Sequence, residues 1–231
     1  MIDVIIALDF QTKVEVENLL AKFKEPVFTK VGMELFYSEG PQIVRYLKEQ
    51  GHKVFLDLKF HDIPNTVAGA VKSVSTLGVD IINLHAAGGI KMMADAKAAI
   101  EAAGSTAKLI AVTQLTSTNG EVLKNEILID RPLDDVVLSY AASAKKAGLD
   151  GVVCSALEVP LIKSVFGAEF ITVTPGIRPA STDKGDQARV VTPEQAAELG
   201  SDYIVVGRPI TKAEDPYAAY LAIKSAFLGG I

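Results

Sequence analysis

The sequence predicts an α/β protein with the TIM (β/α)8 barrel fold. Short runs rich in β-branched residues alternate with amphipathic stretches about eight times along the chain, as expected for repeated strand–helix units. Hydrophobic residues make up 49% of the chain without forming a long apolar run, which is typical of short parallel strands buried on both faces. No low-complexity segment or linker divides the 231 residues. We therefore expect one barrel domain over residues 1–231.

The β-branched runs define the expected strands. They cover residues 4–10, 28–32, 53–60, 81–86, 108–115, 151–155, 170–174 and 203–207. An open doubly wound sheet is the main structural alternative, but eight units favour a closed barrel. Cys154 is the only cysteine, and it falls inside one of these runs, where a small buried thiol is expected.

Helix signals fill the segments between the strands. A capping box beginning at Thr12, Thr192 before Pro193, and Asp215 before Pro216 mark helix starts. The expected helix ends are glycines, because glycine readily adopts the left-handed conformation found there. They are Gly51, Gly78, Gly104, Gly148, Gly167 and Gly200.

A weak internal repeat supports this order of elements. A Gly-x-Asp motif within residues 77–80, 147–150 and 199–202 leads into an expected strand each time. This indicates that one supersecondary unit is reused along the chain.

Composition and charge exclude several kinds of partner. The formal net charge is −5, with no basic run and no tryptophan, whereas nucleic-acid surfaces need clustered lysine and arginine. No apolar run approaches the ~20 residues of a membrane span, and the N-terminus does not look like an export signal. We therefore expect a cytoplasmic protein that binds neither nucleic acid nor membrane.

Charged residues at the end of the third expected strand are the main candidates for chemistry. Asp57 and Lys59 are two residues apart and therefore share a face of the strand, and Asp62 follows in the next loop. In a barrel this face enters the interior near the C-terminal mouth, where barrel active sites lie. A structural ion pair is the alternative, but ionisable groups in this position are typical of active sites.

Polar residues at other expected strand ends should face the same space. Asp9 and Lys30, from the first two strands, would extend the cluster into a mixed-charge network. Arg208 follows Gly207 at the end of the last strand, where many barrels bind phosphate; a surface arginine is the alternative. Thr116, at the end of the fifth strand, would place a hydroxyl at the mouth.

Two expected connections, residues 117–131 and 176–191, are unusually long, and such loops are more often functional than not. The second carries Arg178 and Gln187, and its arginine could grip phosphate oxygens in a bidentate manner. We interpret it as a lid over a charged ligand.

The histidines do not indicate a metal site. His61 and His85 lie in no ligand-spaced cluster, and His52 falls in a helix-to-strand turn. We expect structural or supporting roles for all three, and we expect neither a metal ion nor a cofactor.

The string DLKFHDIPNT, from Asp57 to Thr66, resembles the signature of the orotidine 5'-monophosphate decarboxylase family. The resemblance covers essentially the whole chain. It continues through Leu8-Asp9, Lys30, Thr113-Gln114-Leu115-Thr116, Pro175-Gly176-Ile177-Arg178 and Gly207-Arg208-Pro209. It implies a cofactor-free barrel enzyme that converts orotidine 5'-monophosphate to UMP in pyrimidine biosynthesis.

The resemblance also implies a role for each matching residue. Lys59 would donate a proton, and Lys30, Asp57 and Asp62 would complete an alternating charge network. Many members have serine where this chain has Thr116. The implied substrate-binding residues are Asp9 and Lys30 at the ribose, Thr116 at the pyrimidine, Gln187, Gly207 and Arg208 at the phosphate with Arg178 nearby, and Pro175 as a further contact.

In this family Asp62, Ile63 and Thr66 reach into the partner's site across a dimer interface. The resemblance therefore implies a homodimer with shared active sites.

Two other functions remain open on sequence grounds. Hexulose-phosphate synthases and pentulose-phosphate epimerases are related barrels that also carry Asp-x-Lys on the third strand, and they typically need a metal. A non-catalytic barrel that senses a nucleotide would need the phosphate residues but no lysine in register with two aspartates. The complete string over residues 57–66, together with Lys30, favours the decarboxylase.

Overall fold

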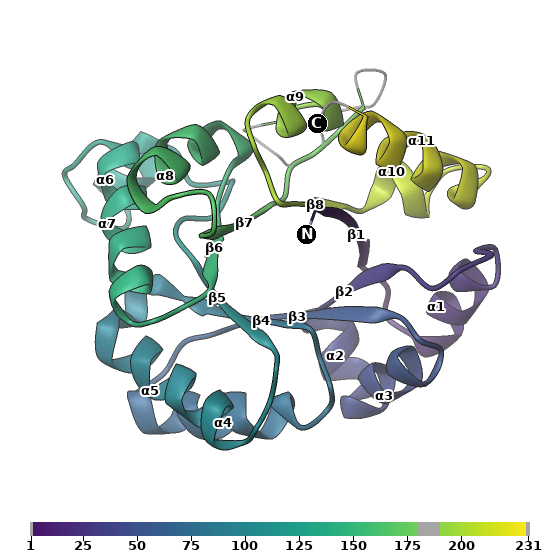
Figure 1. Cartoon of the computed structure of the whole chain (residues 1–231), viewed down its shortest axis with the longest axis horizontal. Helices are drawn as coiled ribbons and strands as arrows, with labels where there is room; N and C mark the ends of the chain where they lie inside the picture. The colour runs from purple at the N-terminus through teal and green to yellow at the C-terminus, as the bar shows by residue number, and fades with distance from the viewer. Residues whose placement is uncertain (1, 180–189, 230–231) are drawn as a thin grey trace.

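The computed structural model describes residues 2–179 and 190–229. Within these residues, eight parallel strands pair in chain order and close into a barrel through the pairing of β8 with β1. The ring of strands lies inside a ring of helices (Figure 1). The predicted TIM (β/α)8 barrel is confirmed.

The strands agree with the expected positions but often end sooner. They are β1 (Asp3–Leu8), β2 (Phe28–Gly32), β3 (Lys53–Phe60), β4 (Ile81–His85), β5 (Lys108–Val112), β6 (Gly151–Val153), β7 (Ile171–Thr174) and β8 (Tyr203–Val206). The largest difference is at β5, which was expected to reach residue 115. There the chain leaves the barrel and turns, with Thr118 N donating to Leu115 O at 2.9 Å, so Thr116 lies in a turn beyond the strand.

The helices cover the outside of the barrel (Figure 1). They are α1 (Lys13–Leu20), α2 (Met33–Glu39), α3 (Pro41–Glu49), α4 (Pro64–Ser75), α5 (Gly89–Ala102), α6 (Gly120–Asn125), α7 (Leu133–Lys146), α8 (Val159–Phe166), α9 (Pro193–Glu198), α10 (Arg208–Thr211) and α11 (Pro216–Leu228), with the 3-10 helices η1 (Ala86–Gly88) and η2 (Ala156–Glu158). None of the helices in the described part of the chain is both long and apolar enough to cross a membrane.

The expected helix boundaries are confirmed. Thr12, Thr192 and Asp215 are the N-caps of α1, α9 and α11, and each side chain accepts hydrogen bonds from backbone N–H groups of the first turn. All six glycines expected at helix ends have positive φ. The long connection after β5 differs from expectation because it contains α6, which Asn119 caps by accepting from Glu121 N and Val122 N.

Alternating strand residues separate two apolar layers. The interior layer fills the barrel and consists of Ile5, Ala7, Phe28, Phe55, Ile81, Ile110, Val173, Tyr203 and Val205. The outward residues, including Leu56, Leu58 and Cys154, pack in the layer beneath the helices. Because the interior layer occupies the barrel, polar residues further along the same strand faces lie at its C-terminal mouth.

The Gly-x-Asp repeat forms ion pairs at the opposite, N-terminal end of the barrel. Each repeat aspartate precedes an even-numbered strand, pairs with a lysine, and accepts a backbone N–H from the preceding strand. We call these the N-terminal ion pairs: Lys48–Asp80 (2.7 Å) with Val54 N, Lys97–Asp150 (2.8 Å) with Leu109 N, and Lys163–Asp202 (2.6 Å) with Thr172 N.

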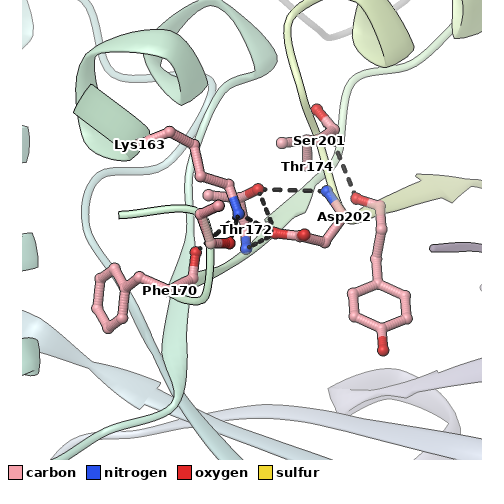
Figure 2. A network of polar contacts seen from close by, with 8 residues as sticks. Lys163, Phe170, Thr172, Thr174, Ser201 and Asp202 are labelled. Atoms are coloured by element: carbon pink, nitrogen blue, oxygen red, sulfur yellow. Dashed lines mark hydrogen bonds and ion pairs between the residues drawn. The ribbon is translucent and has the colours of Figure 1, made fainter. Parts of the chain in front are cut away.

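Figure 2 shows the third of these pairs, in which Lys163 and Thr172 converge on the carboxylate of Asp202. The Lys163 ammonium also donates to the carbonyl oxygens of Ala168 and Phe170, at 2.7 and 3.0 Å. The three protons of this ammonium therefore each have a partner in the fold.

Candidate active site

Three members of the predicted charge network, Lys30, Asp57 and Lys59, meet at the C-terminal mouth. The Lys59 ammonium lies 2.6 Å from Oδ1 of Asp57, and the Lys30 ammonium lies 3.3 Å from Oδ2 of the same carboxylate. Lys30 also contacts Asp9 Oδ1 at 3.2 Å. Three consecutive strands thus bring alternating charges together, as the sequence predicted, with Asp57 buried at the centre.

The network keeps its central groups charged. Burial by itself raises the pKa of Asp57, but the adjacent Lys30 and Lys59 outweigh it and hold that pKa below its ordinary value. Burial likewise lowers the pKa of Lys30, and Asp57 and Asp9 outweigh it, so its pKa is raised. The pairing therefore more than offsets desolvation for both groups.

Lys59 has an unusual backbone conformation. Its φ is 51°, in the left-handed region that residues with side chains adopt only at a cost. The β3–β4 register shifts at this point: Leu56 pairs with Ile82, but Phe60 pairs with Leu84. Strict strand alternation, from which the sequence analysis placed Lys59, is therefore interrupted at that residue.

Asn83, on β4, supports this conformation and was missed by the sequence analysis. It is 1% exposed, accepts from Lys59 N at 2.9 Å, and donates to Asp57 Oδ1 at 2.7 Å. A signal was present, because Asn83 lies two residues after Ile81 and two before His85, so it is a polar residue on the inward face of the strand.

Two adjoining cavities open beside the network. The first, of about 350 Å³, is lined by Asp57, Lys59, Gln114, Thr116 and Ser117, among other residues. The turn beyond β5 and Lys59 therefore border the same cavity.

The second cavity, of about 450 Å³, is lined by Asp9, Arg178, Gly207, Arg208 and Lys212, among others. Lys30, Pro175 and Val205 line both cavities. One ligand with a ring and an anionic group could therefore span them. Lys212 was not predicted, because it follows α10 and its approach to the cavity depends on how that helix turns.

Comparison with known proteins agrees with this geometry. Residues 3–223 match the model of the Orotidine 5'-phosphate decarboxylase / HUMPS family. The chain belongs to this family. Similar curated members are the orotidine 5'-phosphate decarboxylases of Bacillus cytotoxicus and Bacillus mycoides, each 57% identical over 97% of this chain and 97% of the relative.

Solved structures give the same result. The crystal structure of orotidine 5'-phosphate decarboxylase from Lactobacillus acidophilus has a TM-score of 0.89 at 47% identity, covering 98% of this chain and 99% of that one. An uncharacterized conserved protein from Geobacillus kaustophilus has a TM-score of 0.87 at 50% identity, covering 97% and 99%. The family resemblance read from the sequence is confirmed.

The family string also contains residues that the single chain does not bring into the network. Asp62, Ile63 and Thr66 are exposed, and the Asp62 carboxylate accepts from Ile63 N at 2.6 Å. Among the described residues, the ion pairs of Lys30 and Lys59 do not include Asp62. It begins the loop beyond β3, where the chain already turns toward α4.

The remaining predicted family residues divide between the cavities. Thr116 lines the first cavity, and Arg178, Gly207 and Arg208 line the second. Arg178 is largely buried, and its Nη1 donates to Ile177 O at 2.9 Å. Gln187 and most of the expected lid lie outside the described residues.

The three histidines lie in different surroundings. His52 Nδ1 accepts from Val27 N at 3.0 Å, and burial lowers its pKa. The rings of His61 and His85 lie 5.7 Å apart, and burial, then His61 and Lys59, lower the pKa of His85. Within residues 2–179 and 190–229, no group of three or more histidine, cysteine or acidic side chains is arranged to hold a metal ion.

Proposed function

We propose that this chain decarboxylates orotidine 5'-monophosphate to UMP in pyrimidine biosynthesis, without a cofactor, and that Lys59 donates the proton that replaces the lost carboxyl group. The observation that carries the proposal is the Lys59–Asp57 ion pair, 2.6 Å long, at the wall of a cavity of about 350 Å³. The adjoining cavity is lined by two arginines, Arg178 and Arg208, which suit a phosphate group.

The reaction needs a fixed positive charge at the pyrimidine. Loss of carbon dioxide breaks the bond between the ring carbon and the carboxyl carbon and leaves the electron pair on the ring carbon, where it cannot conjugate with the ring carbonyls. The Lys59 ammonium stabilises that charge and then transfers its proton to the same carbon. Asp57 holds the ammonium in position, and Lys30 keeps Asp57 ionised.

The two cavities suit the two ends of a nucleotide. Thr116 faces the pyrimidine in the first cavity, while Lys30, which lines both cavities, and Asp9, which lines the second, bind the ribose hydroxyls. The phosphate occupies the second cavity. Its proposed ligands are Arg178, Gln187, Gly207 and Arg208, with Pro175 lining the path between the cavities.

Gly207 leaves room for this ligand. A Cβ at this position would lie 3.4 Å from Asp9 Oδ2, and both residues line the second cavity. The absence of a side chain allows the phosphate to approach the backbone closely.

We assign Asp62, Ile63 and Thr66 to the active site of a second copy of the chain, in a homodimer with shared sites. All three are exposed, and Ile63 leaves 67% of its surface uncovered, so their side chains are open to contact with a second copy. Across the interface, Asp62 would extend the Lys30–Asp57–Lys59 series by one more negative charge.

The shared site can be tested by mixing two inactive variants, Lys59→Ala and Asp62→Ala. After subunit exchange, each mixed dimer contains one site built from two unmutated contributions, so activity should return. A mixture that stays inactive despite proven exchange contradicts the assignment of Asp62 to the partner's site.

The metal-dependent sugar-phosphate function is not supported, because relatives that are 57% identical over 97% of the chain are named as the decarboxylase. The proposed enzyme works as one barrel domain over residues 1–231 in the cytoplasm. It acts on a free nucleotide and uses neither nucleic acid nor membrane as a partner.

A spectrophotometric assay tests the function directly. Purified protein treated with a chelator should consume orotidine 5'-monophosphate at the same rate as untreated protein and yield UMP. Turnover of a hexulose or pentulose phosphate that the chelator abolishes would overturn the proposal. Binding of UMP without turnover of orotidine 5'-monophosphate would instead indicate a nucleotide sensor.

A further inference from the structure

The register shift between β3 and β4 leaves the N–H of Lys59 outside the strand ladder, and one side chain supplies its hydrogen-bond acceptor. Four steps along β3, from Leu56 to Phe60, correspond to two along β4, from Ile82 to Leu84. The extra residues cannot all join the strand ladder, and a buried N–H without a partner is costly. Lys59 N–H finds its partner in the side chain of Asn83, at 2.9 Å.

The two contacts of Asn83 determine how its amide is oriented. A backbone N–H needs an oxygen, and a carboxylate needs a donor. The Asn83 Oδ1 therefore faces Lys59 N, and Nδ2 faces Asp57 Oδ1. One side chain thus holds both the backbone of the lysine and the carboxylate to which the lysine ammonium is paired.

Asn83 acts at a distance from any ligand. It is 1% exposed and is absent from the described residues that line the two cavities. Lys59 lines the first cavity directly, and its φ of 51° sets where its side chain begins. Small displacements of a reacting group reduce rates strongly, about 100-fold for 1 Å.

We propose that Asn83 is a positioning residue for Lys59. It holds the lysine backbone in the left-handed conformation and orients Asp57, so that the ammonium is fixed at the cavity wall. This inference rests on the proposed function for its kinetic consequence, and its structural consequence can be measured independently.

The test is Asn83→Leu, which removes both hydrogen bonds while keeping a side chain of similar volume. With orotidine 5'-monophosphate, kcat should fall by about 100-fold, while the Kd for UMP changes by less than about threefold, because the phosphate ligands are untouched. A crystal structure of the variant should show Lys59 outside the left-handed region. Asn83→Ala, measured in the same way, replaces it if the leucine variant does not fold.

Thr172→Val is the matched control. Like the Asn83 variants, it removes a neutral side chain that donates a hydrogen bond to an aspartate, here at the other end of the barrel, where Thr172 Oγ1 lies 2.9 Å from Asp202. It should lower the melting temperature without lowering kcat. The proposal is overturned if Lys59 keeps its conformation in a folded Asn83 variant, or if kcat stays within about threefold of the parent. A parent protein without decarboxylase activity refutes the proposed function, and the crystallographic result still decides the role of Asn83.

Discussion

The two ends of the barrel use the same residue types for different purposes. At the C-terminal mouth, Asp57 lies between Lys30 and Lys59; at the N-terminal end, Asp202 pairs with Lys163. The Lys59–Asp57 and Lys163–Asp202 distances are both 2.6 Å. Neither the residue types nor the length of the ion pair distinguishes the two ends.

The difference lies in what satisfies the remaining hydrogen-bonding groups. Asp202 accepts from the backbone and hydroxyl of Thr172, and Lys163 donates to two carbonyl oxygens. In the part of the chain that the structure describes, the partner of the Lys59 ammonium is Asp57, and Lys59 also lines the first cavity. An ion pair tied to the backbone stabilises the fold, whereas one that borders a cavity is available to a ligand.

The largest expected effect separates the two lysines. Lys59→Ala should lower turnover of orotidine 5'-monophosphate by about 1,000-fold or more, since it removes the general acid and the stabilising charge. UMP binding should survive, as calorimetry can show. Lys163→Ala should leave kcat unchanged and lower the melting temperature. Equal turnover in Lys59→Ala and the parent would show that the ion pair at the mouth has no catalytic role.

Within the mouth, Arg208→Ala should lower kcat/KM by about 10- to 100-fold. This is the loss in rate that corresponds to removing one hydrogen bond to a charged group. The loss depends on the phosphate. With orotidine, which has no phosphate, parent and variant should therefore react at equal rates. A loss of the same size with orotidine would show that Arg208 supports the fold or the pyrimidine site instead.

At the N-terminal end, Asp202→Ala should lower the free energy of unfolding by about 2–3 kcal/mol, because it removes the negative charge paired with Lys163 and leaves the N–H of Thr172 without its acceptor. For a chain of this size, each kcal/mol lowers the melting temperature by roughly 2–4 °C. Urea and thermal unfolding measure the effect, and kcat at a temperature where both proteins are folded should be equal. A reduced kcat would show that the two ends are coupled.

The smallest expected effect is a pH dependence. Burial raises the pKa of Asp150, but bonds from Lys97, Leu109 N and Lys108 hold it below its ordinary value. Because this pKa is lower in the folded than in the unfolded chain, the Asp150 carboxylate stabilises the fold at pH values above the unfolded-state pKa of about 3.9. This stabilisation is lost as the pH falls through the folded-state pKa. Asp150→Asn should therefore cost about 1 kcal/mol at pH 7, and the cost should shrink below about pH 4. A cost that is constant over this range would exclude the carboxylate charge as its cause.

Local features of the chain were predictable from sequence. Strand alternation placed Asp57 on the inward face, the side chains of Thr12 and Asp215 marked helix starts, and the string from Asp57 to Thr66 identified the family. Each depends on residues near one another in the chain, where strand period, capping and motif spacing act. The Gly-x-Asp repeat was also visible, although its role was not.

Contacts between distant elements were decided only by the tertiary structure. The bonds of Asn83 depend on the β3–β4 register shift, and the position of Lys212 depends on how α10 leaves the barrel. The N-terminal ion pairs likewise join a helix lysine to an aspartate that precedes a later strand. Sequence determines which side chains are polar and which way a strand presents them, but register and closure of the barrel decide which of them meet, because those contacts join strands that are separate in the chain.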